Sequence, residues 1–319
     1  MKLQIPIEQD LIDRLFPFWT SIFGEGGDLD PDLFLGSETD ACDTTLYLKE
    51  EEGCPVATCL TVRSKTAPGL AGFAEVATDP AVRGRGLASA LCRQAVDDFV
   101  TEGGVAFFLG TGNPVAARIY HRLGWRKLAG ANVMANIVDG RSPEAFLVDH
   151  FREKGAVTVS AAGPDVRIPM IPLIWTPHDT QVLDANVGLF SRRYVMQPSC
   201  MGLYPRYVRT LSGQGAWFAA RTEDARTVGI STARRRGDDS CQVDGFVHGS
   251  YEEAWADTLA PAIEWGRSAG RSVVARVSAE DEDKRSKFES LGFEAEREEA
   301  GGFNIDGREV TAVKLSLTA

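Results

Sequence analysis

The chain has 319 residues, of which 44% are hydrophobic and 25% charged, a composition typical of folded rather than disordered proteins. Its formal net charge of -11 argues against broad electrostatic binding to nucleic acid, and no uncharged apolar run reaches membrane-spanning length. The length allows two domains of ordinary size, each with its own core.

The cysteines and the N-terminus favour a cytoplasmic protein. The 6 cysteines form no CxxC pair and no zinc-ligand spacing, so we expect buried free thiols and no metal site. Free thiols suit a reducing compartment. The N-terminal stretch MKLQIPIEQDLIDRLF carries acidic residues and lacks the apolar core of a secretory signal.

The first half of the chain alternates helical and strand patterns. Apolar residues recur at helical spacing over 10–24, with Pro17 as an expected kink or break, and an acidic glycine-rich loop at 24–36 leads into a short helix. Three strands are predicted next, at 44–50, 54–64 and 69–78. A helix, a buried strand, a second helix and two further strands follow, at 87–104, 105–110, 113–125 and 125–138. This order predicts a mixed α/β domain over residues 1–140.

The second half repeats the first. Residues 271–296 align with residues 103–128 without a gap. Four pairs lie 168 residues apart: Leu91 and Leu259, Val105 and Val273, Leu123 and Leu291, and Gly124 and Gly292. A constant spacing indicates an internal duplication. We therefore predict a linker at 141–168 and a second α/β domain at 169–319.

The stretch DPAVRGRGLASALC, residues 79–92, has the layout of a phosphate-binding loop between a strand and a helix. Gly84 and Gly86 lack side chains, so a ligand can approach the backbone closely. The amides and dipole of the following helix favour an anion, and Arg83 and Arg85 can pair with phosphate oxygens. Neither the Walker nor the Rossmann pattern is present. Taken alone, the stretch fits a basic turn equally well.

Two signatures in order resemble the GNAT acetyltransferase superfamily. They are Arg83-x-x-Gly86-x-Ala88 and, beyond a buried strand, Asn113-x-x-Ala116-x-x-x-Tyr120-x-x-x-Gly124-Trp125. The resemblance covers residues 40–135 well. It implies two GNAT-like domains in tandem, each a mostly antiparallel central sheet flanked by helices. It also implies an enzyme that uses acetyl-CoA.

The resemblance further implies the residues of a coenzyme A site. They are Val76, Ala77, Thr78, Arg83, Gly84, Arg85, Gly86, Leu87, Ala88, Ser89, Asn113 and Ala116. In this scheme residues 76–78 offer backbone groups to the pantetheine arm, and the amides of residues 84–89 take the pyrophosphate. Tyr120 would sit beside the thioester sulfur as the general acid for the leaving thiolate. The alternative for Tyr120 is a packing role on an amphipathic helix.

A general base is harder to identify. At the positions of this strand where members of this family carry a carboxylate or histidines, this chain has Gly72 and Ala74. Glu75 is adjacent, but strand alternation turns it to the opposite face unless a bulge intervenes. A water chain or an acid of the 25–32 loop can serve instead. The acids of that loop, whose charge would favour a cationic amine, are Glu25, Asp28, Asp30 and Asp32.

The second copy lacks the signatures of the first. At the constant offset, the pyrophosphate loop becomes Tyr251, Glu252, Glu253 and Ala254, while Asn113 becomes Asp281 and Tyr120 becomes Phe288. Carboxylates there would repel a pyrophosphate, so we expect this copy not to bind coenzyme A. Tyr194, Tyr204 and Tyr207 stand in a segment, 191–210, that fits an ordinary packed helix and loop better than a ligand site.

Two functions remain open from the sequence. The first is an N-acetyltransferase that acts on a primary amine of a small molecule. The second is a non-catalytic acyl-CoA-binding or interaction protein with the same fold, which the absence of a base at Gly72 and Ala74 motivates. The sequence leaves both a monomer and a homodimer open.

Overall fold

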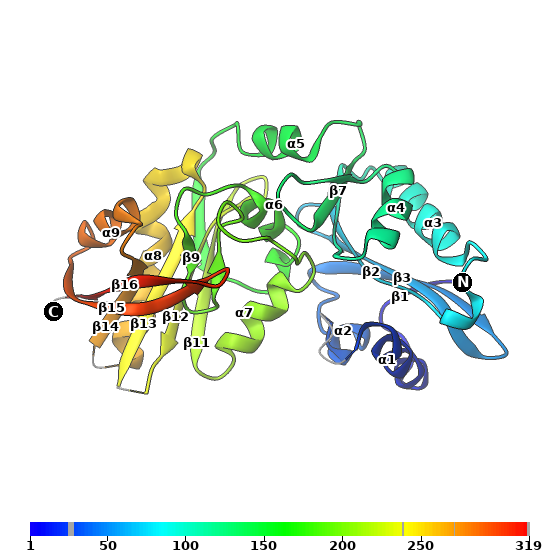
Figure 1. Ribbon diagram of the computed structural model, residues 1–319, viewed down its shortest axis with the longest axis horizontal. Helices are drawn as coiled ribbons and strands as arrows, with labels where there is room; N and C mark the ends of the chain where they lie inside the picture. The colour runs from blue at the N-terminus through cyan, green and yellow to red at the C-terminus, as the bar shows by residue number, and fades with distance from the viewer. Residues whose placement is uncertain (25–28, 238, 271, 318–319) are drawn as a thin grey trace. The chain divides into compact units, whose positions relative to one another are not determined.

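The computed structural model describes residues 1–24, 29–237, 239–270 and 272–317. The chain forms two compact units, and Figure 1 labels many of their helices and strands. Unit 1 comprises Met1–Phe146, Arg167–Pro169 and Pro198–Pro205. Unit 2 comprises Leu147–Val166, Met170–Gln197 and Arg206–Ala319. Each unit contains a seven-stranded, mostly antiparallel sheet flanked by helices, which confirms the predicted fold class.

The sheet of unit 1 has the strand order β1-β2-β3-β4-β5-β7-β6. Its strands are β1 (Lys2–Gln4), β2 (Cys42–Glu51), β3 (Cys54–Ser64), β4 (Leu70–Thr78), β5 (Ala106–Gly110), β6 (Arg126–Lys127) and β7 (Val133–Ile137). The helices are α1 (Gln9–Phe23), α2 (Pro31–Phe34), η1 (Pro80–Val82), α3 (Leu87–Thr101) and α4 (Pro114–Arg122). β4 and β5 pair in parallel. The sequence patterns did not indicate β1, which is a short strand at the edge of the sheet.

Helix α1 continues through Pro17 instead of breaking there. Proline removes one backbone hydrogen bond and crowds the preceding turn. The helix is nevertheless held by its buried face, Ile12, Leu15 and Trp19. The Trp19 indole Nε1 also donates to Thr58 Oγ1 on β3 at 2.9 Å. Tertiary packing therefore overrides the local preference at this proline.

The opposite face of the sheet packs against α3 in a continuous apolar core, which we call the α3-side core. Tyr47, Cys59, Ala71, Phe73, Cys92, Ala95, Phe99, Phe107, Leu109, Tyr120, Trp125 and Met134 make up this core. Phe73 and Trp125 pack with ring centroids 5.1 Å apart, and Phe99 and Phe107 with centroids 4.5 Å apart. Aromatic pairs at these separations add to the stabilisation from buried area. The core fixes α3 and α4 against β4 and β5.

Unit 2 repeats this arrangement, with the strand order β8-β11-β12-β13-β14-β16-β15. Its strands are β8 (Val157–Ala161), β11 (Gly215–Thr222), β12 (Thr227–Arg235), β13 (Ser240–Val247), β14 (Ser272–Ser278), β15 (Phe293–Ile305) and β16 (Arg308–Leu317). A separate antiparallel pair is formed by β9 (Val182–Asp184) and β10 (Leu189–Phe190). The helices are η2 (Pro164–Val166), α6 (Met170–Trp175), α7 (Leu203–Leu211), η3 (Gly249–Ala254), α8 (Trp255–Ala269) and α9 (Glu282–Glu289).

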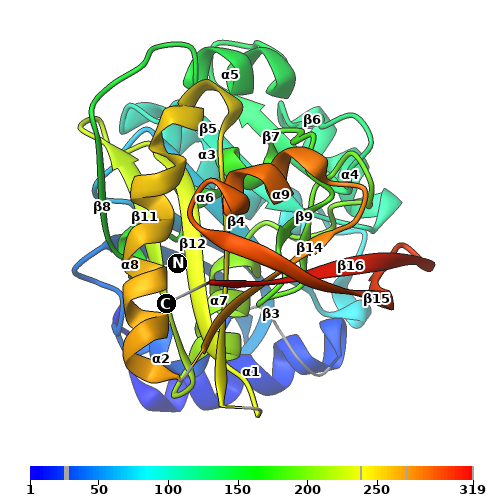
Figure 2. The same ribbon diagram turned by 90° about the vertical axis from the view of Figure 1, so that its left-hand side faces the viewer.

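The two sheets correspond element by element. α8, which lies along one face of the second sheet (Figure 2), begins and ends 168 residues after α3. α9 begins 168 residues after α4. The parallel pair β13–β14 corresponds to β4–β5. The repeat read from the sequence is thus a repeat of the whole fold.

The stretch predicted as a linker, residues 141–168, contains α5 (Pro143–His150), β8 and η2. β8 pairs antiparallel with β11 and so extends the second sheet. The helices of the described residues are all too short or too polar to pass through a lipid bilayer.

Candidate functional site

The parallel strands β4 and β5 separate part of the way along their length. Their pairs are Leu70 with Ala106, Ala71 with Phe107 and Gly72 with Phe108. β4 runs on to Thr78 and stays paired with β3, so Val76, Ala77 and Thr78 lie beyond the last β4–β5 pair. The two strands therefore open into a wedge after Gly72. We call it the β4–β5 opening.

A bulge interrupts β4 at Glu75. The register of β3 and β4 shifts between the pairs Leu60–Ala74 and Thr58–Ala77, and Glu75 has a φ of 47°. The Thr58 hydroxyl donates to the Glu75 carbonyl oxygen at 2.6 Å. Because a bulge breaks the alternation of faces, the opposite-face argument from the sequence does not apply to Glu75. Its role as a base stays a prediction.

The loop that precedes α3 has an open backbone. Gly84 and Gly86 have φ angles of 82° and 76°, a region that favours glycine. A Cβ added at either residue would meet no other atom within 4 Å. Gly86 is also the N-cap of α3 and, as a glycine, has no side chain to cap this helix start. The amides of the first turn, Leu87, Ala88 and Ser89, thus begin a helix whose N-terminal end can accept an anion.

Both predicted arginines lie on this loop. Arg83 Nε donates to the Thr78 carbonyl oxygen at 3.2 Å. Arg85 Nη1 and Nη2 bind the Glu51 carboxylate at 3.1 and 2.6 Å. The Arg85 guanidinium lowers the pKa of Glu51 by this hydrogen bonding. Since the pair is at the surface, it is weak and can exchange for another anion.

Tyr120 lies in the α3-side core next to the β4–β5 opening. It is 6% exposed, and its ring packs edge-on against Phe73 of β4 at a centroid distance of 6.1 Å. Burial, with a smaller contribution from the Cys92 and Cys59 thiols, raises the pKa of Tyr120 well above its usual range. The phenol therefore stays protonated and is a hydrogen-bond donor at neutral pH.

Asn113 and the acids of the 25–32 loop are the remaining predicted residues around the site. Asn113 Oδ1 caps α4 by accepting from the amides of Val115 and Ala116, at 2.9 and 3.4 Å. The oxygen of the Asn113 side chain is thus engaged by the helix. Asp30 and Asp32 are exposed at the start of α2, and Glu25 and Asp28 lie outside the described residues.

Sequence reasoning missed two distant segments that belong to unit 1. Met201 and Ile168 lie over Gly72, and residues 198–200 lie over Gly110. Glycine within a strand is the one available signal, because it often marks a close approach by other backbone or side chains. Of the tyrosines in the segment 191–210, Tyr204 is buried in unit 1 and Tyr207 stacks on Trp217 in unit 2.

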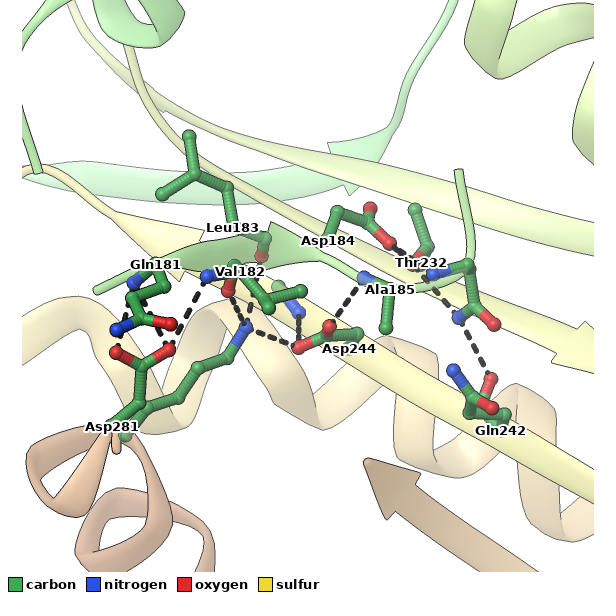
Figure 3. A network of polar contacts seen from close by, with 12 residues as sticks. Gln181, Val182, Leu183, Asp184, Ala185, Thr232, Gln242, Asp244 and Asp281 are labelled. Carbon is green, nitrogen blue, oxygen red and sulfur yellow. Dashed lines mark hydrogen bonds and ion pairs between the residues drawn. The ribbon is translucent and has the colours of Figure 1, made fainter. Parts of the chain in front are cut away.

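The corresponding opening in unit 2 is crossed by the chain itself. β13 and β14 pair up to Gln242 and Val274. Beyond that point, residues 181–185 pass between Asp281 and Asp244 (Figure 3). The Asp281 carboxylate accepts from the Gln181 amide at 2.9 and 3.0 Å. Asp244 Oδ2 accepts from the Ala185 amide at 2.6 Å.

Lys284 locks this crossing segment in place. Its Nζ binds Asp244 Oδ1 at 2.6 Å and donates to the carbonyl oxygens of Val182 and Leu183 at 2.7 and 3.0 Å. The side chains of Lys284 and Asp244 are 2% and 0% exposed. A buried charge pair needs such complete partnering to be tolerated.

The counterpart in unit 2 of the predicted pyrophosphate loop is occupied by contacts within the unit. Tyr251 is buried in η3 and donates to the Glu153 carbonyl oxygen at 2.7 Å. Glu253 pairs with Lys154 at 2.8 Å, and Glu252 with Lys287 at 3.2 Å. This arrangement is acidic where unit 1 has two arginines.

Comparisons with known proteins find one family match and several similar structures. Residues 9–125 match the model of the acetyltransferase (GNAT) family. A GNAT-family acetyltransferase from Streptococcus pneumoniae is 15% identical at a TM-score of 0.38, covering 51% of this chain and 100% of the other. An N-acetyltransferase from Staphylococcus aureus Mu50 is 10% identical at a TM-score of 0.41, covering 51% and 97%. No curated protein matches this chain.

Proposed function

We propose that this protein, whose residues 9–125 form an acetyltransferase domain of the GNAT family, transfers an acetyl group from acetyl-CoA to a primary amine of a small molecule. The observation that carries the proposal is the β4–β5 opening. It has a buried phenol on one side and an uncapped helix N-terminus with two arginines at its mouth. The proposal places the donor and the acceptor in unit 1.

The residues present fit a coenzyme A diphosphate. A side chain at residue 84 or 86 would fill the space beside the loop, and both positions are glycine. The first-turn amides of α3 and the Arg83 and Arg85 guanidinium groups would bind the diphosphate oxygens. Backbone groups of residues 76–78, which lie beyond the last pair with β5, would bind the pantetheine amides. The Asn113 side-chain amide and Ala116 would border the same arm.

Tyr120 is proposed to act on the departing sulfur. Bound acetyl-CoA would supply an activated thioester. The amine nitrogen would form a bond to the acetyl carbon and lose a proton. The carbon–sulfur bond would break, and its electron pair would leave on the sulfur. A phenol with a raised pKa gives up its proton less readily, so its main contribution is a hydrogen bond to the developing thiolate. Glu75, in the bulge of β4, is the carboxylate proposed to receive the proton of the amine, directly or through water.

Substitution of Tyr120 by Phe tests the proposal. A hydrogen bond to a charged group is worth about 1.5–3 kcal/mol, so kcat should fall about 10- to 100-fold with the Kd for acetyl-CoA unchanged. The measurements are thiol release with a panel of primary amines and calorimetry with acetyl-CoA. Tyr47→Phe is the matched control, because Tyr47 lies in the same core but donates to Asp98.

Each outcome has a defined meaning. Full turnover by the Tyr120→Phe protein would remove the assignment of Tyr120. Acetyl-CoA binding without thiol release on any amine of the panel would favour the non-catalytic acyl-CoA-binding alternative. No binding of acetyl-CoA at all would overturn the whole proposal.

A further inference from the structure

Two distant segments of the chain form a strap over the β4–β5 opening. We define the strap as residues 167–169 and 198–205, all of which belong to unit 1. Phe73 and Leu109 point into the α3-side core that contains Tyr120. Since successive residues of a strand face opposite sides, Gly72 and Gly110 face away from that core. The strap therefore covers the side of the opening opposite to Tyr120.

The strap touches both strands where they carry glycine. A Cβ at residue 72 would overlap the Met201 sulfur and would lie 3.1 Å from Ile168 Cδ1. A Cβ at residue 110 would lie 2.7 Å from the Pro198 carbonyl oxygen and 3.3 Å from the Cys200 amide nitrogen. The absence of side chains on both strands is thus a condition for the strap to lie there.

A buried ion pair anchors the strap. Arg167 binds Glu38 through Nε and Nη2 at 2.6 and 2.5 Å, and the two side chains are 4% and 11% exposed. The Arg167 guanidinium also lies 4.5 Å from the centre of the Tyr204 ring. Bidentate pairing and cation–π contact both fix a guanidinium in one orientation. The charge of Arg167 is thereby engaged away from Gly72.

We propose that the strap closes the acceptor side of the reaction site and that Met201 determines which amines reach the acetyl group. This inference rests on the proposed function, because it assumes that the acetyl group lies in the β4–β5 opening. The atoms over Gly72 are a thioether and an aliphatic methyl group. An unpaired charge beside such atoms is costly to desolvate. The site therefore prefers an amine whose neighbouring carbon bears only apolar groups over an amine whose neighbouring carbon bears a carboxylate.

The first test measures the contact itself. Gly72→Ala displaces Met201 and should lower the melting temperature, whereas Gly72→Ala in a Met201→Ala background has room for its methyl group and should lower it much less. Equal losses in the two backgrounds would show that Met201 does not lie over Gly72, which would overturn the inference. Met196→Ala is the control background, because Met196 is 52% exposed.

The second test measures selectivity in the full chain. The wild-type protein should acetylate propylamine in preference to glycine. Met201→Ala enlarges the pocket and should raise the ratio of kcat/KM for 2-phenylethylamine over ethylamine by about tenfold. Pocket volume discriminates by about this much per small group. The same variant should release thiol from acetyl-CoA without any amine at least about threefold faster, because water enters a site that Met201 had kept dry. Met196→Ala should change neither quantity.

The outcomes separate the two proposals. Failure of the wild-type protein to bind acetyl-CoA in calorimetry would overturn the proposed function. Normal acetyl-CoA binding with an unchanged acceptor ratio and unchanged amine-free thiol release in Met201→Ala would overturn only the assignment of Met201. Preference of the wild-type protein for glycine over propylamine would overturn the predicted acceptor class.

Discussion

The two units place different side chains at three equivalent positions. Ala74 and Asp244 each lie two residues beyond the last pair with the parallel neighbour strand. Asn113 and Asp281 are the N-cap residues of α4 and α9. Ala116 and Lys284 are the third residues of the same helices. Unit 1 thus has small or neutral side chains at all three positions, and unit 2 has charged ones.

The difference decides what each opening can hold. In unit 1, the Asn113 side-chain oxygen caps its own helix. In unit 2, Asp281 instead binds the amides of Gln181 and Val182, and Lys284 with Asp244 holds the rest of the crossing segment. One backbone frame therefore serves as a candidate ligand site or as a packed interior, depending on a few side chains.

Removal of Lys284 should have the largest effect on this comparison. Loss of one partner from a buried ion pair leaves an uncompensated charge and costs about 3–5 kcal/mol. We therefore expect Lys284→Met to lower the free energy of unfolding by about this amount in urea denaturation. Acetyl-CoA should bind as before, because the proposed site is in unit 1.

The controls for Lys284 use the same helix and the same pair. Lys287, one turn further along α9, pairs with the exposed side chains of Asp283 and Glu252, so Lys287→Met should cost less than about 1 kcal/mol. The double variant Lys284→Met with Asp244→Leu should recover much of the loss, since it removes both charges. An effect of Lys284→Met as small as that of Lys287→Met would contradict the role of Lys284 in holding residues 181–185.

The pH dependence of stability should come next in size. Burial and the nearby Asp244 charge raise the pKa of Asp184 to about 7. The unfolded carboxyl has a pKa of about 3.9, so between these values the folded state holds a proton that the unfolded state has lost. The contribution of protonated Asp184 to the free energy of unfolding is complete below about pH 4. It is lost as the pH rises toward 7, by up to about 1.4 kcal/mol per pH unit.

Asp184→Asn should remove this slope, because the amide does not titrate. Urea unfolding at pH 5, 6 and 7 measures it. Asp179→Asn is the control, since the Asp179 side chain is 94% exposed and lies in the same stretch of chain. A slope that persists in Asp184→Asn would assign the pH dependence to another group.

The sequence predicted the parts of this comparison that depend on local pattern. The longer helices of unit 1 follow from apolar periodicity and helix-end signals, and the 168-residue offset brings α3 onto α8 residue for residue. The mixed α/β class is confirmed, and residues 9–125 match the acetyltransferase (GNAT) family that the sequence resembles. The loop around Gly86 could be proposed from its residue types and its position before a helix, and the resemblance to the acetyltransferase superfamily favoured an anion site over a basic turn.

Contacts between distant residues could not be read in this way. Residues 167–169 and 198–205 join unit 1 through Arg167 with Glu38 and Met201 over Gly72, which are non-local contacts. The bulge at Glu75 depends on a hydrogen bond from Thr58, 17 residues earlier. The crossing segment of unit 2 is held by side chains about 60 to 100 residues further along the chain, so no local pattern announces it.

A carboxylate at the loop of unit 1 should make it resemble its acidic counterpart in unit 2. Gly86→Asp places a negative charge against the proposed diphosphate and strains a residue with a φ of 76°. We expect the Kd for acetyl-CoA in calorimetry to rise at least about 100-fold, the loss of roughly two charge-assisted contacts.

Gly130→Asp separates charge at the loop from backbone strain. Gly130 has a φ of 71° and open space around it, but it lies outside the loop. This control should leave the Kd for acetyl-CoA unchanged. Equal losses in the two variants would mean that strain, and not the diphosphate contact, explains the effect of Gly86→Asp.

The smallest expected effect concerns Glu51, whose carboxylate binds the Arg85 guanidinium. Any anion that binds Arg85 must displace this carboxylate, so Glu51→Gln should strengthen acetyl-CoA binding, by about two- to threefold because exposed ion pairs are weak. The gain should shrink at high salt, where screening weakens both interactions. Glu50→Gln is the control, since Glu50 pairs with Arg14 instead. Weaker binding by Glu51→Gln would mean that Arg85 serves the loop's structure and makes no contact with the diphosphate.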